Sequence, residues 1–190
     1  MRPILYTPLL LLTACAAGLP WQDPLRYGLG VDVGASGDSV WHFDDGVLFP
    51  SPANAASYIV TRHAYSDFEL RLDFYPVEQT NSGVFIRCED PNSISPFDCY
   101  EINIWDQHAN PESRTGAVVR LSPPLTIVQT EDRWNTMRIL ADGERLRVWI
   151  NDTLTNDFKS SKLGSGQIAL QYGGELGMVR FRNFRIRELR

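Results

Sequence analysis

The chain has 190 residues, a length that suits one domain. Hydrophobic residues make up 43% of the sequence and charged residues 22%, a balance typical of a soluble globular protein, which argues against disorder and against several membrane spans. The formal net charge of -5 argues against nucleic-acid binding, because proteins that bind nucleic acid are expected to be basic.

The first residues of the chain are typical of an export signal. Arg2 supplies a short positive region, and the apolar run over residues 4–12 is too brief to span a bilayer. The tetrapeptide Leu-Thr-Ala-Cys follows at residues 12–15. It resembles a bacterial lipobox, in which cleavage precedes the cysteine and the thiol is acylated.

This resemblance implies a lipoprotein signal peptide over residues 1–14 and a lipid on Cys15, followed by a tether and lead-in over residues 15–36. The alternative is an ordinary secretory signal that is cut near Ala17. Both hypotheses place the mature chain outside the cytoplasm. The first predicts a protein of the bacterial cell envelope that faces the periplasm or the cell exterior and contacts the membrane only through its lipid.

Short strand patterns recur from about residue 39 to the end of the chain. The clearest covers residues 67–75, where apolar and charged residues alternate as in a half-buried strand. Turn signals lie at residues 44–46, 141–143 and 151–152, and no apolar period of 3.6 residues persists over three turns. These patterns predict an all-β sandwich or barrel that forms one domain over residues 37–190. The arginines near the C-terminus alternate with apolar residues, which indicates one solvated strand face.

Cys88 ends one candidate strand and Cys99 begins the next. Antiparallel pairing of the two strands would bring the sulfurs into range, and an exported protein folds in an oxidising compartment. The pattern therefore favours a disulfide that closes the loop between them. A metal pair or a reactive thiol is a weaker alternative, because the loop contains no histidine and no third sulfur.

The two strands that flank this loop, residues 81–87 and 99–106, each have one aliphatic face. Read with a period of two, their other faces carry aromatic, charged and amide side chains. If both aliphatic faces point inward, these side chains share one surface, where a flat ring and a carboxylate can hold a sugar. The residues that we expect on this surface are Phe85, Arg87, Glu101, Asn103 and Trp105.

Glu101 is the best candidate for acid and base chemistry, because it is a carboxylate on an otherwise apolar strand. Burial would raise its pKa and a nearby Arg87 would lower it, which leaves a base usable near neutral pH. The alternative is a structural ion pair between the two residues.

Two residues at the end of the same strand extend this hypothesis. Asp106 and His108, together with Glu101, could form a metal site of two carboxylates and one histidine, so a divalent metal is a possible cofactor, while no cofactor is certain. A solvated aspartate and a surface histidine are the alternative. Trp105 and Trp149 are candidate stacking platforms for a sugar ring, or half-buried aromatic residues of strands.

A longer succession of segments carries a family resemblance. The segments are YSDFELRLDF, NSGVFIR, YEINIWD, TGAV, WNTMRILADGERLRVWIND, GQIALQYGG and VRFRNFRIREL. In this order, they resemble the 3-keto-disaccharide hydrolase family over about residues 37–190. The resemblance implies a concanavalin A-like jelly roll, in which two antiparallel sheets stack and a concave face holds the sugar.

The resemblance also implies an enzyme that acts on glycosides already oxidised to a ketone at C3. A base removes the acidified proton on C2, the C1 oxygen leaves by elimination, and water adds to the enone. The implied roles are Glu101 as base or metal ligand, Arg87 as the cation near the enolate, and Asp106 or His108 as the second acid/base group or ligand. Residues implied to position the substrate are Asn81, Phe85, Asn103, Trp105 and Gln171.

Two alternatives to an enzyme remain open. The first is a carbohydrate-binding, lectin-like surface lipoprotein without catalysis, since a fold does not fix a function. The second is a structural lipoprotein whose concave face meets a protein partner. In the enzyme and lectin hypotheses the partner is an oligosaccharide or glycoside.

Overall fold

The computed structural model describes residues 19–174 and 177–189 of the chain. The predicted signal peptide and Cys15, with its predicted lipid, lie outside the described residues, as does the start of the predicted tether. Within the described ranges no helix is both long and apolar enough to cross a membrane. Regular structure begins at Val33, inside the segment predicted as tether and lead-in, because this part of the chain pairs with a later strand.

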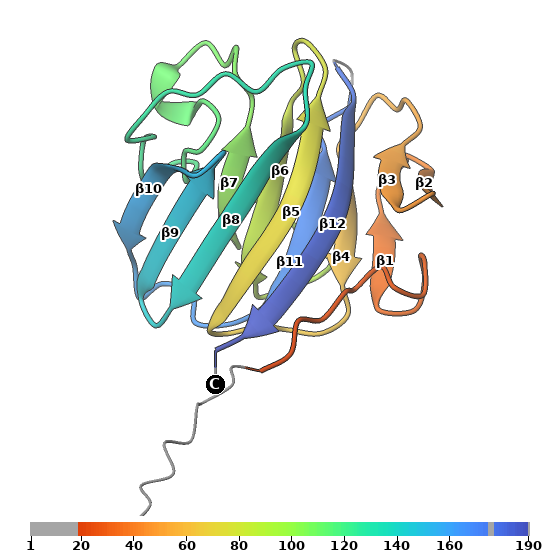
Figure 1. The fold of residues 1–190 in the computed structure, drawn as a ribbon, viewed down its shortest axis with the longest axis horizontal. Coiled ribbons are helices and arrows are strands. Elements are labelled where there is room, and N and C mark those ends of the chain that lie inside the picture. The colour runs from red at the N-terminus through yellow and green to blue at the C-terminus, as the bar shows by residue number, and fades with distance from the viewer. Residues whose placement is uncertain (1–18, 175–176, 190) are drawn as a thin grey trace, which may run out of the picture.

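Two antiparallel sheets form the molecule (Figure 1). The five-stranded sheet contains, in spatial order, β1 (Val33–Ser36), β4 (Ser57–Thr61), β11 (Gln167–Tyr172), β6 (Ser82–Cys88) and β7 (Tyr100–Ile104). The seven-stranded sheet contains β10 (Thr153–Lys159), β9 (Arg145–Ile150), β8 (Asn135–Asp142), β5 (Phe68–Pro76), β12 (Val179–Glu188), β3 (Val47–Pro50) and β2 (Trp41–Asp44). One short 3-10 helix, η1 (Pro111–Ser113), lies in the loop after β7. The predicted all-β, two-sheet antiparallel sandwich is therefore confirmed.

The hydrophobic core lies between the two sheets. Leu70 and Leu72 of β5 and Ile102 and Ile104 of β7 are buried in one continuous cluster, as their period-two spacing predicts. Full burial of each such side chain stabilises the fold by about 1.5–3 kcal/mol. The side chains between these positions point away from the core, so each sheet presents one outer face.

A disulfide joins Cys88 at the end of β6 to Cys99 just before β7, as predicted. The two Cα atoms lie 4.3 Å apart. Both cysteines pack with Val60, Phe85 and Ala169 in a small second cluster, separate from the main core. This cluster lies on the outer face of the five-stranded sheet, so the bond holds the loop over residues 89–98 beside that face.

Candidate functional site

The outer face of the five-stranded sheet carries two rows of side chains that cross all five strands. The first, which we call the polar row, contains Ser36, Tyr58, Gln171, Gly83 and Asn103. The second row contains Gly34, Val60, Ala169, Phe85 and Glu101. The predicted grouping of Glu101 with Phe85, Asn103 and Gln171 on one face therefore agrees with the strand register.

Glu101 is a buried carboxyl without a positive partner. Its exposed fraction is 8%, and no described residue donates a hydrogen bond or forms a salt bridge to the carboxylate. Burial raises the pKa of Glu101 from 4.5 to about 7, because water is removed and no cation replaces it. The carboxyl is thus close to half ionised at neutral pH, as a general base requires.

Gly83 leaves a notch beside this carboxyl. A Cβ atom at position 83 would lie 3.4 Å from Cγ of Glu101, 3.4 Å from Oε1 of Gln171 and 3.2 Å from the backbone oxygen of Ile102. The missing side chain therefore keeps open the space between the glutamate and the glutamine.

Two amide oxygens at this notch have no hydrogen-bond partner among the described residues. They are Oε1 of Gln171 and Oδ1 of Asn103, and both are buried. The amide nitrogen of Asn103 donates to the backbone oxygen of Ser113, which fixes the orientation of this side chain. Because a buried acceptor without a partner is costly, these two oxygens are candidate acceptors for hydrogen bonds at the notch.

Tyr58 is a site residue that the sequence analysis did not identify. The pKa of its hydroxyl is raised, mainly by burial and also by the negative charge of Glu101. A hydrogen bond with Gln171 lowers this pKa but does not cancel the increase. The hydroxyl therefore remains a hydrogen-bond donor over the whole neutral range. The ring makes an edge contact with Phe85 at a centroid distance of 5.7 Å, which holds it on this face.

The prediction that Arg87 lies beside Glu101 is wrong. The guanidinium is 1% exposed and donates to the backbone oxygens of Ser66, Gly143 and Leu163 at 2.7 to 3.1 Å. It also forms a salt bridge to Asp67 at 3.3 Å. The cause is a bulge where the register between β6 and β11 shifts and Arg87 adopts a φ of 52°. The extra residue breaks the alternation, so Arg87 anchors loops instead of facing a ligand.

Asp106 fixes the loops around the end of β7, and its predicted role as a second acid/base group stays a prediction. Its carboxylate accepts hydrogen bonds from the hydroxyl groups of Thr115 and Thr130, at 2.5 and 2.8 Å. The backbone amides of Thr130 and Glu131 donate to the same carboxylate. Both carboxylate oxygens are thus occupied, and the residue ties the loop after β7 to the segment before β8.

His108 belongs to the turn beyond β7. Its Nδ1 lies 3.0 Å from the backbone oxygen and 3.1 Å from the backbone nitrogen of Asn110, and its ring meets Trp105 edge to face at 4.5 Å. Within the described residues no group of three or more histidine, cysteine, aspartate or glutamate side chains could hold a metal ion. Glu101, Asp106 and His108 therefore do not fit the predicted metal site.

The remaining predicted residues lie at the edges of the face or elsewhere. Asn81 and Trp105 directly precede β6 and follow β7, one step beyond the polar row, and both are half-buried. The backbone amide of Gly173 donates a hydrogen bond to the backbone oxygen of Asn81 at 2.9 Å. Trp149 lies on β9 of the other sheet, so it is not part of this face.

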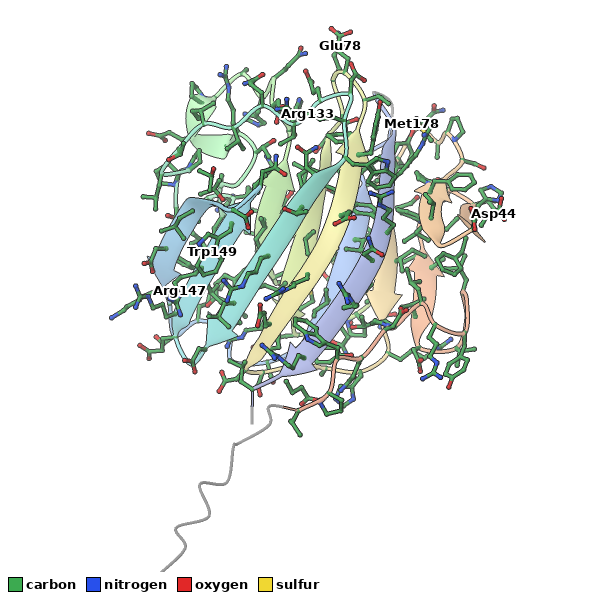
Figure 2. All side chains as sticks on the ribbon, viewed as in Figure 1. Asp44, Glu78, Arg133, Arg147, Trp149 and Met178 are labelled. Carbon is green, nitrogen blue, oxygen red and sulfur yellow. A yellow bond between two sulfur atoms is a disulfide. The ribbon has the colours of Figure 1, made fainter. Side chains whose placement is uncertain are left out.

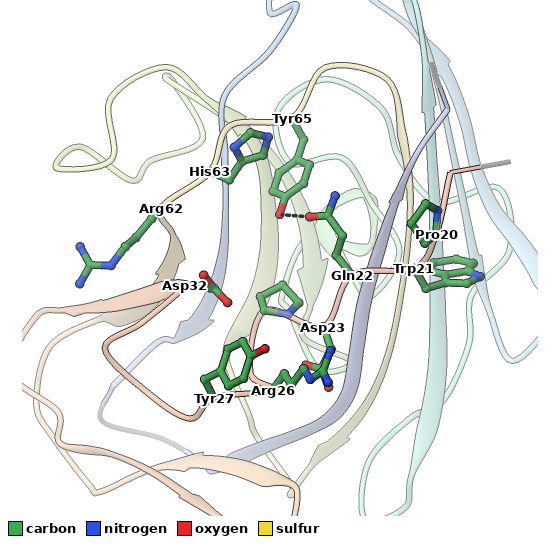
Figure 3. Close-up of a pocket in the computed structure, with 11 residues that line it drawn as sticks. Pro20, Trp21, Gln22, Asp23, Arg26, Tyr27, Asp32, Arg62, His63 and Tyr65 are labelled. Carbon is green, nitrogen blue, oxygen red and sulfur yellow. Dashed lines mark hydrogen bonds between the residues drawn. The ribbon is translucent and has the colours of Figure 1, made fainter.

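Two hollows lie near the five-stranded sheet. One, of about 400 Å³, continues the outer face towards β1 and the disulfide loop, and its lining includes Ser36, Val60, Asn92 and Gln167. A larger one, of about 710 Å³, lies between residues 20–27 and the segment after β4, where Tyr65 donates to Gln22 at 3.4 Å (Figure 3). The larger hollow contains none of the predicted site residues, while the first adjoins the polar row.

Comparisons with known proteins show the family and the fold of the chain. The chain matches the family described as 3-keto-alpha-glucoside-1,2-lyase-like domain over residues 30–187, and it belongs to this family. A search of curated proteins gives no match.

Solved structures share the fold. A protein from Parabacteroides distasonis, described as a candidate glycosyl hydrolase, is 26% identical with a TM-score of 0.75, over 90% of this chain and 100% of that chain. The carbohydrate-binding module CBM66 from Bacillus subtilis is 16% identical with a TM-score of 0.66, over 83% and 96% of the two chains. The lumenal domain of VIP36, solved with Ca²⁺ and Man3GlcNAc, is 10% identical with a TM-score of 0.59, over 84% of each chain.

Proposed function

We propose that this chain is a carbohydrate-active enzyme that cleaves 3-keto-glycosides by elimination across C1 and C2, with Glu101 as the base. The observation that carries the proposal is the state of Glu101, which is buried, has no cationic partner and has a pKa of about 7. A structural carboxylate is normally paired when buried, whereas a catalytic base needs a pKa near the working pH. The family match supports the substrate class.

The chemistry follows from the ketone at C3. The ketone acidifies the proton on C2, and the Glu101 carboxylate takes that proton while the electron pair moves onto the C3 oxygen as an enolate. When the enolate collapses, a C1–C2 double bond forms, the bond from C1 to the glycosidic oxygen breaks, and the leaving alcohol takes up a proton. Water then adds at C1 and releases the free 3-keto sugar.

The residues around Glu101 suit the other requirements of this reaction. The enolate oxygen needs a donor in a site with little water, and the Tyr58 hydroxyl and the Gln171 amide lie in the row beside Glu101. These neutral donors take the role that the sequence analysis gave to Arg87. The free oxygens of Gln171 and Asn103 would hold sugar hydroxyl groups, with Phe85 as the apolar floor.

A binding module without catalysis is the second candidate function. The free amide oxygens would serve binding as well as catalysis, and a carbohydrate-binding module shares the fold. The two functions differ in turnover. Release of the aglycone from an aryl 3-keto-glucoside by the purified protein supports the enzyme, whereas binding of the sugar without release supports the module.

The pH dependence of this assay is the first prediction. Because the base must be ionised and its pKa is about 7, kcat/KM should rise with pH, level off above about 7 and fall about tenfold per unit below pH 6. The measurement is the initial rate of aglycone release at low substrate concentration between pH 5 and 9. A flat profile over this range would contradict the assignment of Glu101 as base.

Filling the notch tests the geometry of the site. In Gly83→Ala the new methyl group lies within 3.4 Å of Glu101 and Gln171, so we expect kcat/KM to fall by about tenfold or more. The backbone of Gly83 needs no positive φ, so the fold should lose only about 1 kcal/mol. Gly164→Ala, where nothing lies within 4 Å of the new Cβ, is the matched control. Equal activity of both variants would show that the notch is not used.

A further inference from the structure

The outer face of the seven-stranded sheet is rich in arginine, although the whole chain has a net charge of -5. We call the outward side chains of β5, β8, β9 and β12 the arginine face. These four strands contain eight arginines: Arg71, Arg138, Arg145, Arg147, Arg180, Arg182, Arg185 and Arg187. The same strands contain four acidic residues: Glu69, Asp73, Asp142 and Glu188. The charge of the molecule is therefore unevenly distributed.

Three of these arginines stand side by side across the sheet. Arg71 is directly opposite Arg138 on one neighbouring strand and Arg185 on the other, and Arg138 is in turn opposite Trp149. Like charges in directly opposed positions of a sheet destabilise it. An anion lying along this row would remove that repulsion.

A buried carboxylate compensates only part of this charge. Glu69, which is 2% exposed, forms salt bridges with Arg71, Arg138 and Arg187 at 2.6 to 2.7 Å. One negative charge thus faces three guanidinium groups, which leaves two positive charges in excess. Within the described residues Arg180 and Arg185 form no salt bridge at all.

Aromatic rings hold the guanidinium groups against the sheet. Arg138 lies over the ring of Trp149 at 4.4 Å, and Arg182 lies over Trp134 at 4.0 Å. Figure 2 shows Trp149 and Arg147 on the outer side of β9. A hollow of about 340 Å³ opens on this surface, and its lining includes Arg71, Arg138, Trp149 and Arg185 together with the carboxylates of Asp73 and Asp152. The face thus combines fixed donors, a half-buried indole and room for a ligand.

We propose that the arginine face is a second binding site, which takes an acidic polysaccharide, a chain of sugars with carboxylate groups. Guanidinium groups match carboxylates in bidentate geometry, and Trp149 offers a surface for a sugar ring. Neighbouring strands lie about 4.8 Å apart, which is close to the length of one pyranose unit, so the row presents about one guanidinium per sugar. The large exposed hydrophobic residues that would enter a membrane are absent from these four strands.

Binding of polygalacturonate tests this proposal. We expect the intact protein to bind it at low ionic strength, to bind fully methyl-esterified polygalacturonate at least about tenfold more weakly, and to lose affinity as salt is added. Arg185→Gln removes a charge without breaking a salt bridge, and should weaken binding by about three- to tenfold. Release of aglycone from a 3-keto-glycoside should not change in this variant, so this test is independent of the proposed catalytic site.

The control is Arg26→Gln, which removes an exposed arginine that lies over Tyr27 at 5.4 Å, away from the arginine face. Binding that is unchanged in Arg185→Gln, or reduced equally in both variants, would overturn the proposal. Failure of the intact protein to bind polygalacturonate would do the same. Vesicles of anionic phosphatidylglycerol serve as a further probe, and tighter binding to them than to polygalacturonate would replace the polysaccharide by a lipid surface.

Discussion

Glu101→Gln is expected to lower kcat for aglycone release from a 3-keto-glycoside by about 10²- to 10⁴-fold. The amide has nearly the shape of the carboxyl group but cannot take a proton from C2. Substrate binding should change little, because the free oxygens of Asn103 and Gln171 remain in place. Glu144→Gln, at an exposed position in the turn between β8 and β9, is the control and should keep full activity. A Glu101→Gln protein with normal turnover would refute the assignment.

The same substitution should make the fold more stable at high pH. The pKa of Glu101 is raised from 4.5 to about 7, so the fold prefers the neutral carboxyl. The neutral carboxyl therefore contributes to the free energy of unfolding of the wild type. This contribution is fully present below pH 4.5 and is lost as the pH rises through 7, which lowers the free energy of unfolding by up to about 3 kcal/mol. The glutamine side chain stays neutral at every pH. The melting temperature of the Glu101→Gln protein should therefore exceed that of the wild type at pH 8 and match it at pH 4. Lower stability of the variant at both pH values would point to a structural role for Glu101.

Arg87→Met should lower the free energy of unfolding by about 3–5 kcal/mol. The substitution keeps an apolar chain but leaves the backbone oxygens of Ser66, Gly143 and Leu163 without their donor. Urea denaturation followed by tryptophan fluorescence measures the loss. Arg62→Met, where an exposed guanidinium contacts the oxygen of Gly30, should cost less than about 0.5 kcal/mol.

The activity of the Arg87→Met protein distinguishes a role of Arg87 as a catalytic cation from its role as an anchor of loops. At a temperature where the variant is folded, its kcat should stay within a few-fold of wild type, and its pH profile should keep the same midpoint. A large drop in kcat with unchanged stability would instead restore Arg87 as a catalytic cation.

Strand alternation made much of the architecture predictable. The period-two pattern of β5 predicts the burial of Leu70 and Leu72. The same pattern in β7 directs Glu101 to the outer face of the sheet and Ile102 to the core. The disulfide could be predicted because its cysteines end and begin adjacent strands that pair directly. These features depend on residues close together in the sequence.

Other features depend on contacts that a local pattern does not contain. A bulge in β6 shifts Arg87 out of the alternation, and no turn residue marks this position. The carboxylate of Asp106 accepts hydrogen bonds from hydroxyl and backbone amide groups of segments that follow it in the chain. Tyr58 joins the site only because β4 lies next to β11, more than a hundred residues later. Such non-sequential pairing explains why a tyrosine in an ordinary strand pattern was overlooked.

The disulfide between Cys88 and Cys99 also determines how the site is assembled. It connects the two strands that carry Gly83 and Glu101, at the end where these strands meet their loop. Sliding β7 by one residue would turn Glu101 into the sandwich and expose Ile102. A covalent tie between the strand ends excludes such misalignment, so correct placement of the carboxyl is coupled to thiol oxidation. Reduction of this bond is therefore expected to loosen the alignment of Gly83 with Glu101.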